Sequence, residues 1–196
     1  VKGTPGVLYA TTGDYDGSEV LNSIGVYKST DMGETWVATN LTYNLNDTKL
    51  LGHLVVYDDM TVVVATPSSI KRTTDGGGIW TDVFVQGGSP VNFGRMASFG
   101  TNIVCTDSYE GIYISTDSGV NWIEAVPPNA FGKLAVTADE SGNFFVQDKT
   151  GQIKSLSLAG TLTNVGTIPA DYNSQYGYNQ ALIVKNNLII ILHFFN

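Results

Sequence analysis

The chain has 196 residues, and its 18 acidic and 10 basic side chains give it a net charge of −8. The basic residues are scattered rather than clustered, which argues against nucleic-acid binding. The single cysteine, Cys105, excludes an intrachain disulfide and a cysteine-based metal site, and its apolar neighbours favour a buried, inert thiol.

Short strands are predicted along the whole chain, because apolar or alternating runs are separated by turn formers. In chain order the predicted strands cover residues 6–12, 25–30 and 35–40; 51–57, 60–66, 69–74 and 79–85; 94–99, 102–106, 111–116 and 121–125; 133–138, 143–147, 153–158 and 163–167; and 180–184 and 188–194. His53 and His193 lie 140 residues apart in strand-like runs and are expected to be placed by sheet packing. The last apolar run, 188–192, is too short to span a membrane.

One eight-residue pattern recurs between these strands, at 29–36, 73–80 and 115–122. Its aspartates, Asp31, Asp75 and Asp117, are 44 and 42 residues apart. A fixed period of about 40–45 residues is typical of radial repeat folds with four strands per unit. The repeat therefore predicts the architecture, and it favours a structural role for these aspartates.

The residue types of the pattern predict a self-capped turn followed by an apolar anchor. The Asp carboxylate can accept hydrogen bonds from backbone N–H groups ahead of it, and the Gly supplies a positive φ. The Trp begins the next strand and is expected to pack against neighbouring hairpins. The residues expected to play these structural roles are Ser29, Asp31, Gly33 and Trp36; Thr73, Asp75, Gly77 and Trp80; and Ser115, Asp117, Gly119 and Trp122.

The pattern resembles the Asp-box, or bacterial neuraminidase repeat, which reads Ser/Thr-x-Asp-x-Gly-x-Thr-Trp. The first copy matches every defined position, whereas Ile79 and Asn121 stand where the pattern has Thr. The resemblance, to propellers of the sortilin and xyloglucanase type, implies an all-β, β-propeller-like array of four-stranded antiparallel blades. About four to five blades are expected in a single domain, with units at about 1–40, 41–86, 87–126, 127–168 and 169–196; the alternative is a segment of a larger propeller.

The fourth unit has lost the pattern. The strand before each turn contains an equivalent apolar residue, in the order Val26, Ile70, Ile112 and Ile153, with spacings of 44, 42 and 41. Counting on from Ile153 puts Leu158 at the Asp position and Thr163 at the Trp position, whereas Gly160 is kept. Terminal repeats often diverge, so we expect this unit to be the loosest of the complete ones.

The resemblance also predicts where a ligand would bind. In propellers, the loops between second and third strands and the loops between units line one mouth of the channel, opposite the repeated turns. These loops contain aromatic rings among carboxylates and amides, which suits a sugar but is also ordinary loop composition. The first candidates for ligand binding are Tyr15, Tyr43, Tyr109 and Tyr176.

Function has to be argued from the site, because the repeat marks the fold and not the chemistry. Sialidases hold a substrate carboxylate with three arginines, and this chain has only Arg72 and Arg95. A glycoside hydrolase needs two carboxylates about 5–9.5 Å apart. Asp14, Asp16, Glu110 and Asp171 are the candidates for such a catalytic pair, and no motif singles out two of them.

We therefore expect a non-catalytic binding or structural propeller module that recognises carbohydrate or a protein surface. The alternative is a glycoside hydrolase that is not a sialidase. No metal, cofactor, nucleic-acid partner or membrane span is expected. Open strand edges favour association with further propeller segments or with copies of the chain itself. The expected location is extracellular, on a cell surface or on a virion.

Overall fold

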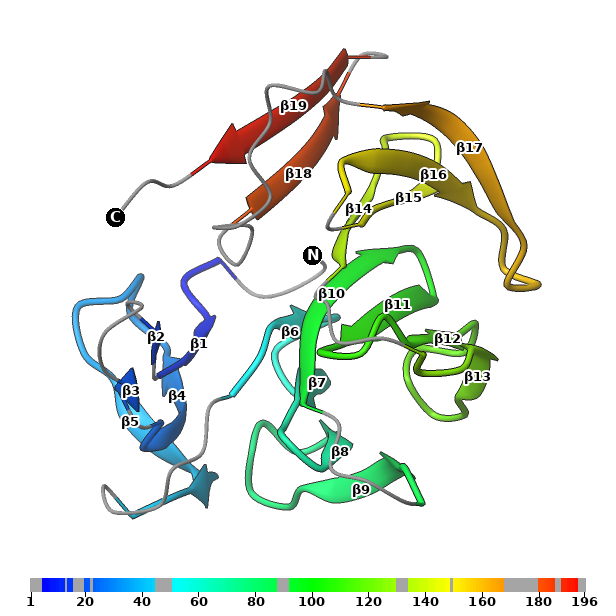
Figure 1. Cartoon of the computed structure of the whole chain (residues 1–196). Helices are drawn as coiled ribbons and strands as arrows, with labels where there is room; N and C mark the ends of the chain where they lie inside the picture. Colours follow the sequence, from blue (N-terminus) through cyan, green and yellow to red (C-terminus); the bar gives the residue numbers. More distant parts are fainter. Residues whose placement is uncertain are drawn as a thin grey trace. The chain divides into compact units, whose positions relative to one another are not determined.

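A computed structural model describes residues 5–12, 14–15, 20–21, 23–44, 51–87, 92–129, 134–148, 150–167, 180–185 and 188–193. The chain divides into two compact units, Val1–Gly94 and Arg95–Asn196. Each unit is built from antiparallel sheets whose strands follow one another in sequence (Figure 1). The division falls inside one strand, and each unit is described here by itself.

The first unit contains two main sheets and a small hairpin. The strands of its three-stranded sheet are β1 (Leu8–Thr11), β4 (Gly25–Ser29) and β5 (Val37–Thr42). The strands of its four-stranded sheet are β6 (Leu54–Val56), β7 (Val62–Ala65), β8 (Ser69–Thr73) and β9 (Thr81–Val85). The hairpin of β2 (Asp14–Tyr15) and β3 (Val20–Leu21) interrupts the connection from β1 to β4, and the sequence pattern does not predict it.

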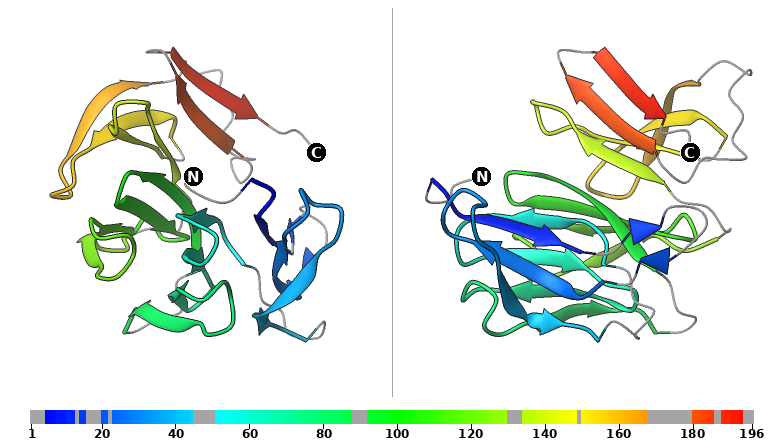
Figure 2. Two further views of the ribbon diagram at one scale, coloured as in Figure 1. Left: turned by 180° about the vertical axis from the view of Figure 1, so that it is seen from behind. Right: turned by 90° about the vertical axis from the view of Figure 1, so that its left-hand side faces the viewer.

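The second unit continues the same plan. The strands of the third sheet are β10 (Phe93–Phe99), β11 (Asn102–Asp107), β12 (Ile112–Ser115) and β13 (Ile123–Val126). The strands of the fourth sheet are β14 (Ala135–Ala138), β15 (Phe144–Gln147), β16 (Gln152–Leu156) and β17 (Leu162–Thr167), and β18 (Gln180–Lys185) pairs with β19 (Leu188–His193). Within each sheet the strands alternate in direction (Figure 2). The predicted all-β array of four-stranded antiparallel sheets is confirmed, and none of the described residues forms a helix that could cross a membrane.

Successive sheets bury apolar side chains against each other. In the first unit, Val26 and Leu41 of one sheet form a cluster with Leu51 and Val64, which belong to the next. In the second unit, a larger cluster joins the third and fourth sheets; its buried members are Val104, Ile112, Ile114, Leu134, Phe144, Val146 and Leu156. In the second sheet, β7 is apolar along its whole length and fully buried.

The outermost strands of the sheets share a β-bulge. Val83, Ala125 and Val165 are the extra residues in β9, β13 and β17, each inserted opposite the step that follows Ile70, Ile112 or Ile153. The register is also irregular between β4 and β5, at the step from Gly25 to Tyr27. A bulge bends and twists an exposed edge strand, which makes it a poorer template for pairing with another chain.

The glycine of the repeated turn brings one sheet close to the next. A Cβ on Gly77 would lie 2.6 Å from Thr39 Cγ2 of β5, and one on Gly160 would lie 2.9 Å from the Ala125 carbonyl oxygen of β13. Both glycines also have positive φ, at 100° and 86°. The survival of Gly160 in a unit that has lost the rest of the pattern follows from this double constraint, because neither requirement involves the missing Asp or Trp.

Replacing Gly160 with Ala should lower the free energy of unfolding by about 1–2 kcal/mol, the cost of a left-handed non-glycine residue, with the contact to Ala125 adding to it. Gly166→Ala is the matched control, since a Cβ there meets nothing within 4 Å. Urea denaturation measures both variants. Equal effects of the two substitutions would contradict this explanation.

Candidate functional site

The repeated turns lie between β4 and β5, between β8 and β9 and between β12 and β13, and their side chains bind the N–H groups of the same turn. The first residue of each turn accepts a hydrogen bond from the N–H of the glycine, at 2.8 Å for Ser29, 3.0 Å for Thr73 and 2.9 Å for Ser115. Its hydroxyl donates to the aspartate two residues on, at 2.7, 2.7 and 2.9 Å in the three copies. The aspartate in turn accepts the N–H four residues ahead, at 2.9 Å in all three copies.

These bonds lower the pKa of each carboxylate. For Asp31 the hydrogen bond from the Thr35 hydroxyl contributes most, followed by the Thr35 N–H and Ser29, and together they bring the pKa to about 2. The pKa of Asp75 and that of Asp117 are also lowered, chiefly by the backbone N–H four residues ahead. A carboxylate that holds its own turn in this way is poorly suited to act as a general acid near neutral pH.

The three tryptophans are not equivalent. Trp36 and Trp122 donate their indole N–H to the glycine carbonyl of their own turn, at 3.0 and 3.1 Å. In the second turn that carbonyl, on Gly77, accepts the N–H of Asn40 instead. Trp80 packs against the cluster around Val64, and its buried indole nitrogen has no hydrogen-bond partner among the described residues. Trp36 is 40% exposed, so the expected apolar anchor is only partly buried there.

A second family of capped turns lies at the opposite end of each sheet, directly before β4, β8, β12 and β16. The residue that follows Thr11, Ala65, Thr106 or Gln147 is Thr12, Thr66, Asp107 or Asp148, and we call these four the cap residues. Their equivalence rests on strand register, since the residues before them pair with Val26, Ile70, Ile112 and Ile153. Sequence reasoning missed them, although a Thr or Asp directly after each buried strand was a usable signal.

Asp107 accepts hydrogen bonds from the backbone of the turn that follows it. It is 2% exposed, and its Oδ1 accepts the N–H of Tyr109 at 2.7 Å and that of Gly111 at 2.8 Å. Its Oδ2 accepts the hydroxyl of the fully buried Tyr113 at 2.8 Å. A Cβ on Gly111 would lie 2.4 Å from that Oδ2, so only glycine fits beside the carboxylate. The Tyr109 carbonyl also accepts the N–H of Asn129, in the connection toward the fourth sheet.

Asp148 repeats this arrangement in the fourth sheet. It accepts the N–H of Thr150 at 2.9 Å and that of Gln152 at 3.1 Å, and Lys154 takes the place of the buried tyrosine, with its Nζ 3.1 Å from Oδ2. Burial raises the pKa of Asp148, but the hydrogen bonds from Thr150, Lys154 and the backbone outweigh burial and hold the pKa below its ordinary value. In both turns the carboxylate therefore accepts the N–H groups two and four residues ahead.

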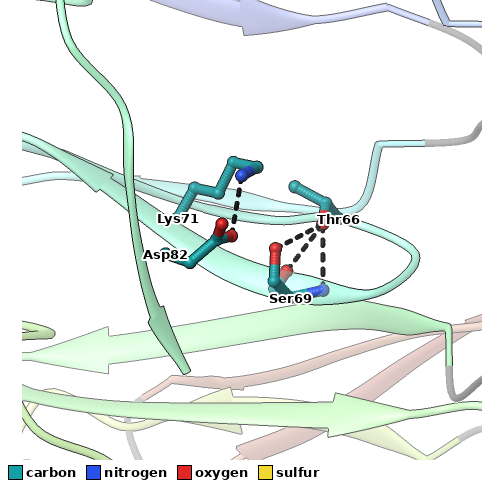
Figure 3. Close-up of polar contacts among 4 residues, drawn as sticks. All are labelled: Thr66, Ser69, Lys71 and Asp82. Carbon is teal, nitrogen blue, oxygen red and sulfur yellow. Dashed lines mark hydrogen bonds and ion pairs between the residues drawn. The ribbon is translucent and has the colours of Figure 1, made fainter. Parts of the chain in front are cut away.

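The cap of the second sheet, Thr66, is uncharged, and the nearby lysine, Lys71, pairs with a different residue (Figure 3). Thr66 Oγ1 donates to the Ser69 carbonyl at 2.8 Å and accepts the Ser69 N–H at 3.1 Å. Lys71, whose counterpart Lys154 binds its cap carboxylate, instead forms an ion pair with Asp82 of β9, at 2.7 Å. In both sheets the lysine pairs with a carboxylate. Lys71 cannot pair with its own cap, because Thr66 carries no negative charge.

The first sheet departs most from the plan. Thr12 Oγ1 accepts the N–H groups of Ile24 and Gly25, at 2.9 and 3.1 Å, so the cap itself is kept. Between Thr12 and these two donors the chain inserts the β2–β3 hairpin. Insertions within a repeat protein commonly map to the loops of one face, which is often the face that binds ligands.

Two of the sequence-predicted candidates lie next to each other on the Asp107 turn. Tyr109 is 37% exposed, and Glu110 beside it has a positive φ of 61°. Asp14 and Tyr15 lie in β2, but their side chains are outside the described part of the structure. Asp16, Asp171 and Tyr176 lie outside the described residues altogether.

Tyr43 follows the end of β5 and packs against the cluster of Val26, Leu41, Leu51 and Val64. Burial raises the pKa of its phenol, and the negative charge of Asp82 raises it further. Tyr43 therefore contributes to the contact between the first two sheets, which limits how much of its ring a ligand could cover.

Gln147 occupies the position equivalent to Thr106. Thr106 Oγ1 donates to the Leu134 carbonyl at 3.1 Å and links the third sheet to the fourth. Gln147 is fully buried, and neither polar atom of its side chain has a partner among the described residues. Within the described part of the chain, no group of three or more His, Cys, Asp or Glu residues is placed to hold a metal ion.

No protein-family model and no curated protein matches the chain. Among solved structures it is similar to YCF48 bound to a D1 peptide, with a TM-score of 0.56 and 18% identity, over 82% of this chain and 51% of that one. For YCF48 from Cyanidioschyzon merolae, the TM-score is 0.54, the identity 15% and the coverage 83% and 60%. For the GH74 enzyme of Niastella koreensis, the values are 0.55, 22%, and 81% and 28%.

These similarities support the fold class, a β-propeller-like array, and at such identities they show the fold alone. The chain spans between 51% and 60% of the length of the two YCF48 structures and 28% of the GH74 structure.

Removing the Asp31 carboxylate should destabilise the protein in a pH-dependent way. Because the folded-state pKa of about 2 lies below the ordinary value, the carboxylate stabilises the fold above about pH 4 and loses this effect as the pH falls toward 2. Asp31→Ala should therefore melt below wild type at pH 7, and the gap should narrow between pH 4 and pH 2. Thermal melts across this range measure it; a gap independent of pH would contradict the capping role.

Replacing Asp107 with Ala should lower the free energy of unfolding by about 3 kcal/mol, because several buried donors lose their acceptor. Tyr113→Phe removes a single hydrogen bond and should cost about 1 kcal/mol. Urea denaturation compares the two variants. If Asp107→Ala were no more harmful than Tyr113→Phe, the carboxylate would not be the central acceptor of this turn.

Proposed function

We propose that this chain is a non-catalytic, propeller-type binding module whose ligand is a polypeptide segment. It binds through the end of the sheets that carries the cap residues. We assign the turns at 29–36, 73–80 and 115–122 to the Asp-box class on their sequence and hydrogen bonds. In this proposal they stabilise the scaffold and take no part in recognition.

The observation that carries the proposal is the exposed Tyr109 on a turn that cannot easily rearrange. Tyrosine provides a large contact area with only two rotatable side-chain bonds, and it is enriched at binding hot spots. The turn beneath it is fixed by Asp107, Gly111 and Tyr113, so little conformational entropy is lost on binding. The Tyr109 carbonyl is also bound by Asn129.

The carboxylates support binding rather than hydrolysis. A glycoside hydrolase needs a general acid whose pKa is raised. The aspartates whose pKa is shifted, among the described residues, are Asp31, Asp58, Asp75, Asp82, Asp117, Asp139 and Asp148, and all of them are shifted downward. Glu110 lies within the Asp107 turn, between Tyr109 and Gly111, rather than at a cap position.

The similar structures point to both classes. One of them is YCF48 with a bound D1 peptide, and others are GH74 enzymes. Polypeptide recognition is favoured here because Tyr109 presents an exposed ring on a turn fixed by Asp107, whereas glycoside hydrolysis requires two acids across a gap. Glycoside hydrolysis is therefore the outcome that the experiment must be able to detect.

The test is a selection of phage-displayed random 12-residue peptides on the purified chain. Enriched peptides should share a motif, and Tyr109→Ala should weaken their binding about tenfold, the usual loss at a hot spot. Tyr109→Phe, which keeps the ring, should retain most of the affinity. Failure to enrich any peptide would overturn the proposal, as would release of reducing ends from xyloglucan that is abolished by Glu110→Gln.

A further inference from the structure

We propose that β1 binds an extended segment of a partner polypeptide as an added antiparallel strand. The segment binds along the side of β1 that faces away from β4, which we call the β1 edge. Its side chains are uncharged and mostly small or β-branched. This inference goes beyond the proposed function, because it concerns the other unit of the chain and does not involve Tyr109.

The β1 edge is unpaired where the other sheets have a strand. β1 corresponds to β7, β11 and β15, because a cap residue directly follows each of these strands in the same register. Those three strands each lie between two partners, whereas β1 pairs with β4 alone among the described strands (Figure 1). In the described part of the first sheet, no strand takes the place of β6, β10 and β14.

The chain enters β1 in the same way as it enters β7 and β11. Two residues before Leu8, the Gly6 carbonyl accepts the N–H of Met32 at 3.0 Å. The equivalent bonds in the next two sheets, at 2.9 and 2.8 Å, join the N–H of Gly76 to Met60 and the N–H of Ser118 to Thr101. The first sheet thus holds β1 in the geometry of its counterparts, so the edge is preorganised for an added strand.

The second sheet identifies the backbone groups that an added strand would bind. There, Ala65 donates its N–H to the His53 carbonyl at 3.0 Å and accepts the N–H of Gly52 at 2.9 Å. Ala65 pairs with Ile70 as Thr11 pairs with Val26, so Thr11 is its equivalent in β1. We therefore expect the N–H and the carbonyl of Thr11 to bind the partner strand.

The bonds between β1 and β4 leave these groups free to do so. Thr12 donates its N–H to the Gly25 carbonyl at 3.2 Å, which makes these two residues a hydrogen-bonded pair. Bonded and non-bonded pairs alternate along an antiparallel ladder, so the backbone groups of Tyr9 and Thr11 point away from β4. A partner strand can bind both residues without disturbing the first sheet.

Burial marks the same strand as incompletely covered. Leu8 is 42% exposed, whereas the residues at the same place in the other three sheets, Val62, Ile103 and Phe144, are 0%, 0% and 1% exposed. A strand bound beside β1 would cover part of this apolar surface, which favours the complex.

The other sheets show the chemistry of a strand that fits. The residues placed opposite β7 and β15 by their partners are Leu54, Val55 and Val56 of β6, and Ala135, Val136, Thr137 and Ala138 of β14. None of these side chains is charged, and most are small or β-branched, as suits a strand packed among others. A partner segment with the same properties is therefore expected at the β1 edge.

The test uses a fluorescein-labelled peptide that copies residues 134–140, and fluorescence anisotropy measures its binding to the whole chain. In β14 the N–H groups of Ala135 and Thr137 face β15, because Asp139 donates to the Asn143 carbonyl and bonded pairs alternate. N-methylation of the peptide at these two positions should weaken binding at least about tenfold, since two hydrogen bonds are lost. The isomer methylated at the positions of Val136 and Ala138 should bind like the unmodified peptide.

Thr11→Pro tests the edge from the side of the protein. Proline removes the N–H that would bind the partner strand, whereas the bonds to β4 do not involve this residue. The peptide should bind at least about tenfold more weakly to this variant. The matched control is Asn164→Pro in the edge strand β17, at a position whose N–H also points away from the sheet, and it should leave the affinity unchanged. The methylated peptides keep the test decisive if Thr11→Pro does not fold, because they leave the protein unaltered.

The outcomes separate this inference from the proposed function. If the two methylated peptides bind equally well, or if no peptide binds, the β1 edge accepts no strand and the inference is wrong, whatever the phage selection gives. If Tyr109→Ala weakens the peptide and Thr11→Pro does not, the peptide binds at the cap end and the inference is again wrong. A wild-type dimer in sedimentation experiments that Thr11→Pro dissociates would show a second copy at the edge, which also contradicts a different partner.

Discussion

The structure depends on one requirement, which is that the backbone N–H groups of its tight turns find acceptors. A meander of short strands has a turn every few residues, and each turn leaves N–H groups that no strand partner can reach. This chain meets the requirement with a side-chain oxygen placed at the start of the turn. Asp31 does so at one end of a sheet and Asp107 at the other, each accepting an N–H four residues ahead.

That requirement limits what the acidic residues can do. A carboxylate that accepts several N–H groups is stabilised in its charged form, as the lowered pKa of Asp31 and of Asp148 illustrates. Such groups are fixed inside their turns and are not available for proton transfer. On the turn that Asp107 holds, the exposed side chain is that of Tyr109.

Differences between the repeats are as informative as their similarity. Beside the uncharged cap Thr66, Lys71 forms an ion pair with Asp82, whereas Lys154 forms an ion pair with its cap Asp148. The first sheet inserts a hairpin where the other sheets have a short turn. The third sheet has Glu110 where the fourth has Gly151. Each difference falls at the same end of a sheet. At the opposite end, Asp31, Asp75 and Asp117 keep the same bond to the N–H four residues ahead.

The periodic part of the fold could be predicted from the sequence because local chemistry repeats with it. The strands recur at 44, 42 and 41 residues and the Ser/Thr-x-Asp turns at 44 and 42, and no long-range information was needed to locate seventeen of the strands within a few residues. The capping bonds of Asp31, Asp75 and Asp117 join residues no more than four apart, so they too follow from the sequence.

Tertiary structure decided what depends on neighbouring sheets. The sequence could not show that Asn40 would bind the Gly77 carbonyl in place of Trp80, because Asn40 and Gly77 are 37 positions apart and belong to different sheets. Nor could it show that Tyr43 would be half-buried in a cluster while Tyr109 stayed exposed, since both are loop tyrosines in the sequence. Short-range hydrogen bonds are encoded where they form, whereas burial is set by which distant residues the packed sheets bring together.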